Sequence, residues 1–345
     1  MSDQAREAHK TAPVLSVRNL QTHFRTFRGV ARAVDDVSFD VYPGETLGVV
    51  GESGCGKSVT SLSIMRLVDP PAGFHPGGQI HFGGHDLLKL PEREMLRLRG
   101  GELAMIFQEP MTSLNPIFRV GTQIGESLRV HRGMDRKAAR AESLRLMERV
   151  GIPDPEKRLD DFPHQLSGGM KQRVMIAMAL SCKPKLLIAD EPTTALDVTI
   201  QAQILDLLRD LQAELGMAIL LITHDLGVIA EMAHRVVVMY GGRVVEEATV
   251  EALFDAPHHP YTQGLFRSLP SVNQRKERLA VIPGMVPPAT DFPSGCRFRN
   301  RCELATEACA VRLPDLVPVG VSGGRAACVH LGDPDASSPG TLASD

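Results

Sequence analysis

Apolar residues follow two different periods along this chain. In residues 14–24 (VLSVRNLQTHF) and 33–45 (AVDDVSFDVYPGE), turn residues interrupt short runs of alternating apolar and polar positions, which is typical of antiparallel strands. The apolar runs in 185–192 (KLLIADEP) and 217–225 (MAILLITHD) are strand-length, and the amphipathic helical pattern of 200–216 separates them. This strand–helix–strand unit predicts a parallel sheet that is covered on both faces.

The pattern changes twice elsewhere in the chain. Helical spacing dominates residues 91–178, as in the segment 136–151 (RKAARAESLRLMERVG). After Phe254, prolines and glycines become frequent and the periodicity stops, so we expect a domain boundary near residue 255. The closing residues 333–345 (DPDASSPGTLASD) are small and polar, which predicts a disordered tail.

Length and composition favour two domains, or one large domain with an appendage. The chain has 345 residues, of which 43% are apolar and 23% are charged, so it can form a sizeable core. Because its net charge is −3 and it has no tryptophan, we expect no nucleic-acid partner. The polar start (MSDQAREAHKTAP) lacks a signal-peptide core, and no apolar run approaches the roughly 20 residues that cross a bilayer. We therefore expect a cytoplasmic protein, unless a partner carries it to a membrane.

Residues 51–58 (GESGCGKS) fit the phosphate-binding pattern G-x-x-x-x-G-K-[ST] between an apolar strand and a helix. The glycines allow backbone N–H groups to surround phosphates, and the helix presents its positive end to the same anions. Lys57 would reach the β- and γ-phosphates, and the Ser58 hydroxyl would ligate Mg²⁺. The context disfavours the alternative of a glycine turn that matches by chance. The predicted nucleotide-binding residues here are Gly51, Glu52, Ser53, Gly54, Cys55, Gly56, Lys57 and Ser58.

Residues 186–191 (LLIADE) form an apolar strand that ends in two acids. Alone, this pattern is most often a strand end that emerges at the surface. Behind a phosphate loop, Asp190 would bind Mg²⁺ directly or through water, and Glu191 would orient and polarise the attacking water. The chain is therefore predicted to bind and hydrolyse a nucleoside triphosphate.

Residues 166–173 (LSGGMKQR) place Ser167, Gly168 and Gly169 at the start of a second helix. A helix N-terminus binds anions, and one chain does not need two receptors for one terminal phosphate. The pattern therefore predicts a site that is completed across a dimer. By itself, however, it is usually only a capped turn.

Together these motifs resemble those of the ATP-binding cassette (ABC) ATPases. GESGCGKS, LSGGMKQR and LLIADE occur in that family's order and spacing, together with Gln108, ALD (195–197) and His224 in ITHD. The resemblance covers about residues 14–255. It implies an α/β fold, a P-loop NTPase of the ABC ATPase type, over residues 12–255. That fold has a mixed sheet core, an antiparallel β subdomain and a helical subdomain, here at about 91–178.

The resemblance also implies roles for single residues. ATP would lie between the phosphate loop of one domain and the Ser167-Gly168-Gly169 segment of a second. Gln108 would sense Mg²⁺ and the γ-phosphate, His224 would contact the γ-phosphate, and Asp197 would couple the two sites. With Glu191, the first two form the predicted catalytic set.

An aromatic side chain ahead of the phosphate loop stacks on adenine in this family. Phe24 is the first candidate and Phe27 the second. Phe24 fits an ordinary core position equally well.

Two further stretches resemble the oligopeptide/dipeptide branch of the ABC importers, whose relatives also take up nickel: QEPMTSLNP (108–116) and HHPYTQGLFRSLP (258–270). This implies a C-terminal extension of small irregular structure over residues 256–332. It also implies two polytopic permease subunits, a second ATPase subunit that is commonly a different chain, and an extracytoplasmic peptide-binding protein, with this chain at the cytoplasmic face of the inner membrane. The alternatives are a nickel or other small-solute importer, a soluble non-transport ABC ATPase, or a regulatory ATP-binding module.

Four of the six cysteines lie in this extension: Cys296, Cys302, Cys309 and Cys328. A reducing compartment argues against disulfides, and their spacing is not the C-x₂-C pairing of most zinc sites. Four thiolates are the full ligand set of an iron–sulfur cluster, and in the importer branch this cysteine pattern implies [4Fe–4S]. Structural zinc and unliganded thiols are the alternatives.

Overall fold

The computed structural model describes residues 12–108, 113–194, 196–268, 281–320 and 323–331. The tail predicted for 333–345, residues 109–112 of the importer-like motif and Ala195 lie outside the described residues.

A four-stranded antiparallel sheet precedes and follows the phosphate loop in the chain. Its strand order is β2-β1-β4-β5. The bounds are β1 (Leu15–Thr26), β2 (Gly29–Val41), β4 (Gly73–Phe82) and β5 (His85–Asp86). In β1, Leu15, Val17 and Leu20 are fully buried, whereas Arg18 and Asn19 are exposed. The alternating pattern thus predicted the strands and their buried face.

A second sheet forms the centre of the molecule. Among the described residues it has eight strands in the order β11-β12-β10-β9-β3-β8-β7-β6. Strand β3 pairs in parallel with β8 and β9, and β7 pairs in parallel with β6 and β8. Strands β3, β7 and β8 are buried along their whole length, as apolar strands covered on both faces must be. The bounds are β3 (Thr46–Val50), β6 (Leu103–Ile106), β7 (Leu186–Asp190), β8 (Ala218–Ile222), β9 (Arg235–Tyr240), β10 (Arg243–Thr249), β11 (Val317–Val319) and β12 (Gly324–Ala326).

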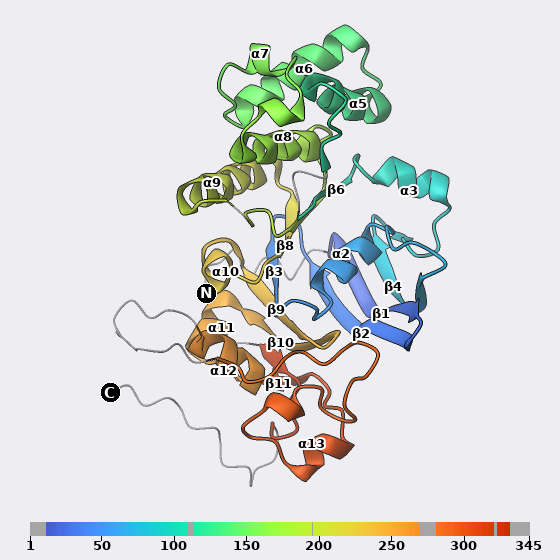
Figure 1. Ribbon diagram of the computed structural model, residues 1–345, viewed down its shortest axis with the longest axis vertical. Coiled ribbons are helices and arrows are strands. Elements are labelled where there is room, and N and C mark those ends of the chain that lie inside the picture. Colours follow the sequence, from blue (N-terminus) through green and yellow to red (C-terminus); the bar gives the residue numbers. More distant parts are fainter. Residues whose placement is uncertain (1–11, 109–112, 195, 269–280, 321–322, 332–345) are drawn as a thin grey trace.

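The helices form a separate lobe at one end and cover the sheet elsewhere (Figure 1). The lobe contains α5 (Val120–Arg132), α6 (Arg136–Arg149), α7 (Pro155–Arg158), η2 (Pro163–Gln165) and α8 (Gly168–Leu180). The other helices are α2 (Lys57–Ile64), α3 (Glu92–Leu98), α9 (Val198–Leu215), α10 (Leu226–Met232), α11 (Val250–Asp255), α12 (Pro260–Arg267), η3 (Arg299–Arg301) and α13 (Glu307–Val311). None of these helices is long and apolar enough to cross a membrane.

The helical lobe is narrower than the range 91–178 that the sequence predicted. Strand β6 lies inside that range and pairs with β7 of the central sheet. Met95 of α3 is buried with the side chains of the antiparallel sheet. Short elements such as β6 carry too few residues to show their period in the sequence.

The C-terminal extension continues the central sheet across the expected boundary near residue 255. Strand β12 pairs with β10 through Glu246–Ala326 and Glu247–Arg325, and β11 forms the edge. Both added strands have three residues, so the sequence shows no alternation there.

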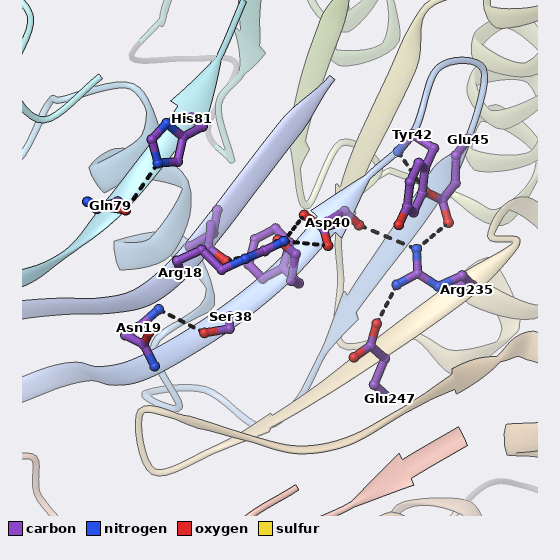
Figure 2. Close-up of polar contacts among 12 residues, drawn as sticks. Arg18, Asn19, Ser38, Asp40, Tyr42, Glu45, Gln79, His81, Arg235 and Glu247 are labelled. Carbon is purple, nitrogen blue, oxygen red and sulfur yellow. Dashed lines mark hydrogen bonds and ion pairs between the residues drawn. The ribbon is translucent and has the colours of Figure 1, made fainter. Parts of the chain in front are cut away.

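A buried ion network holds β9 and β10 together (Figure 2). Arg235 donates to Glu45 at 2.9 Å and also to Glu247. Glu247 accepts a further hydrogen bond from Arg325 of β12. Glu45 and Glu247 are both nearly inaccessible to solvent. The network therefore compensates buried carboxylates and joins the extension to the sheet.

Candidate active site

The phosphate loop connects β3 to α2 in a backbone conformation that requires glycine. Gly51, Gly54 and Gly56 have φ of 152°, 80° and 106°, in the region that L side chains avoid. A Cβ at Gly51 would lie 2.3 Å from the carbonyl oxygen of Met239, and one at Gly56 would lie 2.5 Å from that of Ala33. The loop can therefore curl only because side chains are missing at these positions.

Lys57 is turned into this loop. Its Nζ donates to the carbonyl oxygens of Gly51 at 2.7 Å and Glu52 at 3.2 Å, and the residue is 6% exposed. The ammonium group is thus held at the centre of the loop. Cys55 is fully buried beside it, and burial raises the pKa of the Cys55 thiol.

Asp190, at the end of β7, contacts the first turn of α2. Its carboxylate accepts hydrogen bonds from Ser58 Oγ at 3.2 Å and Ser61 Oγ at 3.3 Å. Burial raises the pKa of Asp190, which is 3% exposed. Ser61 was not among the predicted residues, although its position one helical turn after Ser58 places both hydroxyls on one face of α2.

Three other polar side chains contact the carboxylate of Glu191. Gln108 Nε2 and Thr194 Oγ1 both donate to Oε2 at 2.9 Å, and His224 Nδ1 lies 3.2 Å from Oε1. The structure thus brings together all three predicted catalytic residues, Gln108, Glu191 and His224. Thr194 was not among the predicted residues. The only indication in the sequence is its position three residues after Glu191.

Glu191 is held in an unusual backbone conformation. Its φ is 49°, and its N–H donates to the carbonyl oxygen of Ile222 at 2.8 Å. A positive φ in a non-glycine residue costs conformational energy and occurs often at active sites. Burial opposes ionisation, but hydrogen bonds from Thr194 and His224 outweigh it and lower the pKa of Glu191. The group is therefore a carboxylate at neutral pH.

The oxygen atoms around Asp190 fit a magnesium ion. The Ser58 hydroxyl and the Asp190 carboxylate are hard donors within 3.2 Å of each other, at the mouth of the phosphate loop. Mg²⁺ in phosphoryl-transfer sites takes few protein oxygens and completes its shell with substrate phosphates and water. The donor set therefore suits Mg²⁺ with a nucleotide.

Comparisons with known proteins agree with this geometry. Residues 34–194 match the family described as ABC transporter, and residues 245–309 match the oligopeptide/dipeptide transporter C-terminal region. A peptide import ATP-binding protein of Brucella melitensis is 55% identical over 318 residues, which cover 89% of this chain and 94% of that protein. The chain belongs to the ATP-binding subunits of the ABC transporter family.

Another relative of this ABC subunit is the dipeptide transport ATP-binding protein DppD of Escherichia coli (strain K12). It is 53% identical over 326 residues, which cover 94% of this chain and 99% of DppD. The ATP-binding cassette MJ0796, solved as a dimer bound to ADP and Pi, aligns with a TM-score of 0.62 and 26% identity, over 68% of this chain and 98% of that one. The cbiO1 subunit from Clostridium perfringens aligns with a TM-score of 0.60. The predicted ABC ATPase fold is thus confirmed.

The Ser167-Gly168-Gly169 segment of the ABC subunit lies at the start of α8 in the helical lobe. Ser167 caps this helix by accepting a hydrogen bond from the N–H of Met170 at 3.3 Å, and Ser167 and Gly168 are exposed. The phosphate loop precedes α2 beside the antiparallel sheet, outside this lobe (Figure 1). Asp197 caps α9 by accepting from the N–H of Ile200 at 2.9 Å. Ser167 and Asp197 thus each cap the N-terminus of a helix in this chain.

The two adenine-stacking candidates differ in their surroundings. Phe24 is partly buried and packs over Gly73, where its ring would lie 3.1 Å from an added Cβ. Phe27, at the tip of the β1–β2 hairpin, is 96% exposed. Phe24 thus lies against β4, whereas the Phe27 ring has the Arg28 guanidinium 5.5 Å from its centroid.

The four cysteines of the extension lie close enough for the charges of their thiolates to interact. Burial, and then the neighbouring thiols, raise the pKa of Cys302 to about 11. The backbone N–H of Cys296 donates to the carbonyl oxygen of Cys309 at 2.8 Å, and Cys309 Sγ lies 3.6 Å from His330 Nε2. In the described ranges, however, no three His, Cys, Asp or Glu side chains are arranged as a group that could hold a metal ion. The [4Fe–4S] ligation by these cysteines therefore stays a prediction.

Proposed function

We propose that this chain binds and hydrolyses ATP to drive the import of dipeptides or oligopeptides through a membrane transporter. The convergence of Gln108, Thr194 and His224 on Glu191, next to the phosphate loop, is the observation that carries the hydrolytic part. The peptide assignment is supported by the names of its relatives and by the match at residues 245–309.

Each polar group at the site has a role in this hydrolysis. Lys57 binds the β- and γ-phosphates, and Ser58 and Asp190 hold Mg²⁺, which neutralises phosphate charge when it is bound. Glu191 orients and deprotonates the attacking water. Gln108 and His224 keep the Glu191 carboxylate in place and face the terminal phosphate. Phe24 stacks on the adenine.

A second ATPase subunit completes the site. Ser167, Gly168 and Gly169 lie at the start of α8 in the helical lobe, outside which the phosphate loop of their own chain lies (Figure 1). We propose that this helix N-terminus serves the nucleotide held by the partner. Asp197 then lies at the junction between the two sites. The partner is a different chain, so the pair is a heterodimer.

The remaining partners are two polytopic permease subunits and, through them, an extracytoplasmic peptide-binding protein. Closure of the ATPase dimer on ATP turns the permease outward, and hydrolysis reopens the dimer. The chain works at the cytoplasmic face of the cell membrane.

Purification with co-expressed membrane partners tests this function. We expect two permeases and a second ATPase to co-purify, and ATPase activity to rise when peptide and its binding protein are added together to the reconstituted complex. If nickel or another solute stimulated the ATPase activity and peptides did not, the peptide assignment would be overturned. An active ATPase without membrane partners would overturn transport.

For the extension, we propose that the four cysteines bind a [4Fe–4S] cluster after their side chains rotate together. The support is a complete set of four thiols that lie near one another in one small lobe, which is the number of ligands that such a cluster takes. Protein purified without air should absorb near 400 nm and contain about four iron atoms per chain. Stoichiometric zinc without colour, or no metal, would refute the cluster.

A further inference from the structure

The second residue of the phosphate loop, Glu52, is held by two residues of the C-terminal extension. The guanidinium of Arg301 donates to both carboxylate oxygens of Glu52, at 2.6 and 3.0 Å. The backbone N–H of Glu52 donates to the Tyr261 hydroxyl at 2.8 Å. The separations along the chain are 249 and 209 residues, so only the folded extension can make these contacts.

Arg301 is fully engaged in this position. Its Nε donates to the carbonyl oxygen of Pro283 at 2.8 Å, and its two terminal nitrogens also reach the Tyr240 hydroxyl at 3.4 Å and the carbonyl oxygen of Ile282 at 3.3 Å. With the two bonds to Glu52, these contacts use all five guanidinium donors. Such complete pairing identifies an anchor that is built into the fold and not an incidental surface ion pair.

Aromatic packing holds the anchor rigid. Tyr240 and Tyr261 are 1% and 0% exposed, with ring centroids 4.7 Å apart, and Phe298 packs against both. The side chain of Arg301 is 5% exposed, whereas that of Glu52 is 28% exposed. The carboxylate therefore lies where the buried anchor meets the open phosphate loop.

The charge of Glu52 has a direct consequence for nucleotide binding. The carbonyl oxygen of Glu52 accepts a hydrogen bond from Lys57 Nζ at 3.2 Å, so Glu52 would line the space that the nucleotide phosphates occupy when they bind. An unpaired carboxylate there would repel a polyphosphate anion and would compete for Lys57. The bidentate pair with Arg301 removes this repulsion and fixes the loop.

We propose that Arg301 is a positioning residue for ATP binding, which makes the C-terminal extension part of the nucleotide site. Arg301 neutralises Glu52, and Tyr261 fixes the Glu52 backbone, so the loop is preorganised before ATP arrives. This inference rests on the proposed ATPase activity; Glu52 belongs to the phosphate loop of that site, whereas Arg301 is not one of its predicted residues.

Steady-state ATPase kinetics of the full chain in its transporter complex test this inference. We expect Arg301→Met to raise KM for ATP by about tenfold or more, with kcat within about threefold of wild type. The double variant Glu52→Gln with Arg301→Met should have a KM at least about threefold lower than that of Arg301→Met alone, because the repelling charge is gone. A purely structural Arg301 would leave the double variant as impaired as the single one, and this result would overturn the proposal.

Arg299→Met is the matched control. Arg299 is a half-buried arginine of the same extension, but its guanidinium donates to the carbonyl oxygens of Ser294 and Ala310, which both lie within the extension. Its KM for ATP should equal that of wild type, and an equal increase in both variants would overturn the proposal. If Arg301→Met does not fold, Arg301→Lys applies the same test. An inactive wild-type protein would refute the ATPase function itself.

Discussion

Gln108 donates a hydrogen bond to the carboxylate of Glu191 across 83 residues of sequence, at 2.9 Å. Gln108 follows β6 and Glu191 follows β7, and these strands are parallel neighbours in the central sheet. The carboxyl ends of parallel strands meet at one edge of a sheet, which is where α/β proteins bind their ligands. The contact therefore follows from strand order and links the segment after β6 to the carboxylate of Glu191.

Replacement of Glu191, the proposed general base, should separate ATP binding from hydrolysis. We expect Glu191→Gln to lower kcat by about 10²–10⁴-fold, because an amide cannot accept the proton of the attacking water. ATP affinity should be unchanged, and a closed dimer should accumulate, as measured by nucleotide binding and sedimentation. Glu251→Gln, on the exposed first turn of α11, is the control. Undiminished turnover in Glu191→Gln would disprove the assigned role.

The Thr194 hydroxyl should matter for the rate more than for binding. Thr194→Val removes one donor to Glu191 in a side chain of nearly equal size. Loss of a hydrogen bond to a charged group should lower kcat by about 10- to 100-fold with little change in KM. Thr194→Ser keeps the donor and should retain most of the activity. Equal rates for the valine and serine variants would contradict this explanation.

The Arg235 network should contribute to the stability of the fold. Arg235→Met leaves the carboxylates of Glu45 and Glu247 buried without their shared partner, which should cost about 3–5 kcal/mol in urea unfolding. Arg325→Met is a matched comparison, because Arg325 pairs with the same Glu247 but its side chain is 46% exposed. Its loss should cost about 1 kcal/mol or less. Similar costs for both variants would refute the importance of burial.

His259 should make stability fall in mild acid. It is buried at the start of α12, where Nδ1 accepts from the N–H of Tyr261 at 3.0 Å, and burial lowers the pKa of His259 to about 3. Because the unfolded residue titrates near 6.5, the unfolded state binds more protons below that pH. Lowering the pH from 7.5 to 5 should therefore cost about 2 kcal/mol from this residue.

His259→Asn isolates that contribution, since its amide oxygen can still cap α12 but does not titrate. Urea unfolding at both pH values should show a pH-dependent loss about 2 kcal/mol larger in wild type than in the variant. The same pH dependence in both proteins would rule out His259 as its source.

The local parts of the fold and site were predictable from the sequence. The alternation in residues 14–24 and 33–45 predicted β1 and β2, and the apolar runs predicted β7 and β8. The glycine spacing of the phosphate loop was equally informative, because the φ values of 80° to 152° at Gly51, Gly54 and Gly56 strongly favour glycine. Each of these features depends on neighbours within a few residues.

Only the tertiary structure decided the contacts between segments that are distant in the sequence. The arrangement of Gln108, Thr194 and His224 around Glu191 depends on strand order. The addition of β11 and β12 to the sheet involves two three-residue strands, which are too short to show a period in the sequence. The pairing of Arg301 with Glu52 has no sequence signal at all, since an arginine between two cysteines can face any carboxylate that the fold provides. By itself, the sequence determined the chemistry of the phosphate loop. The packing of the extension determined which charges surround it, because burial and distance are properties of the folded chain.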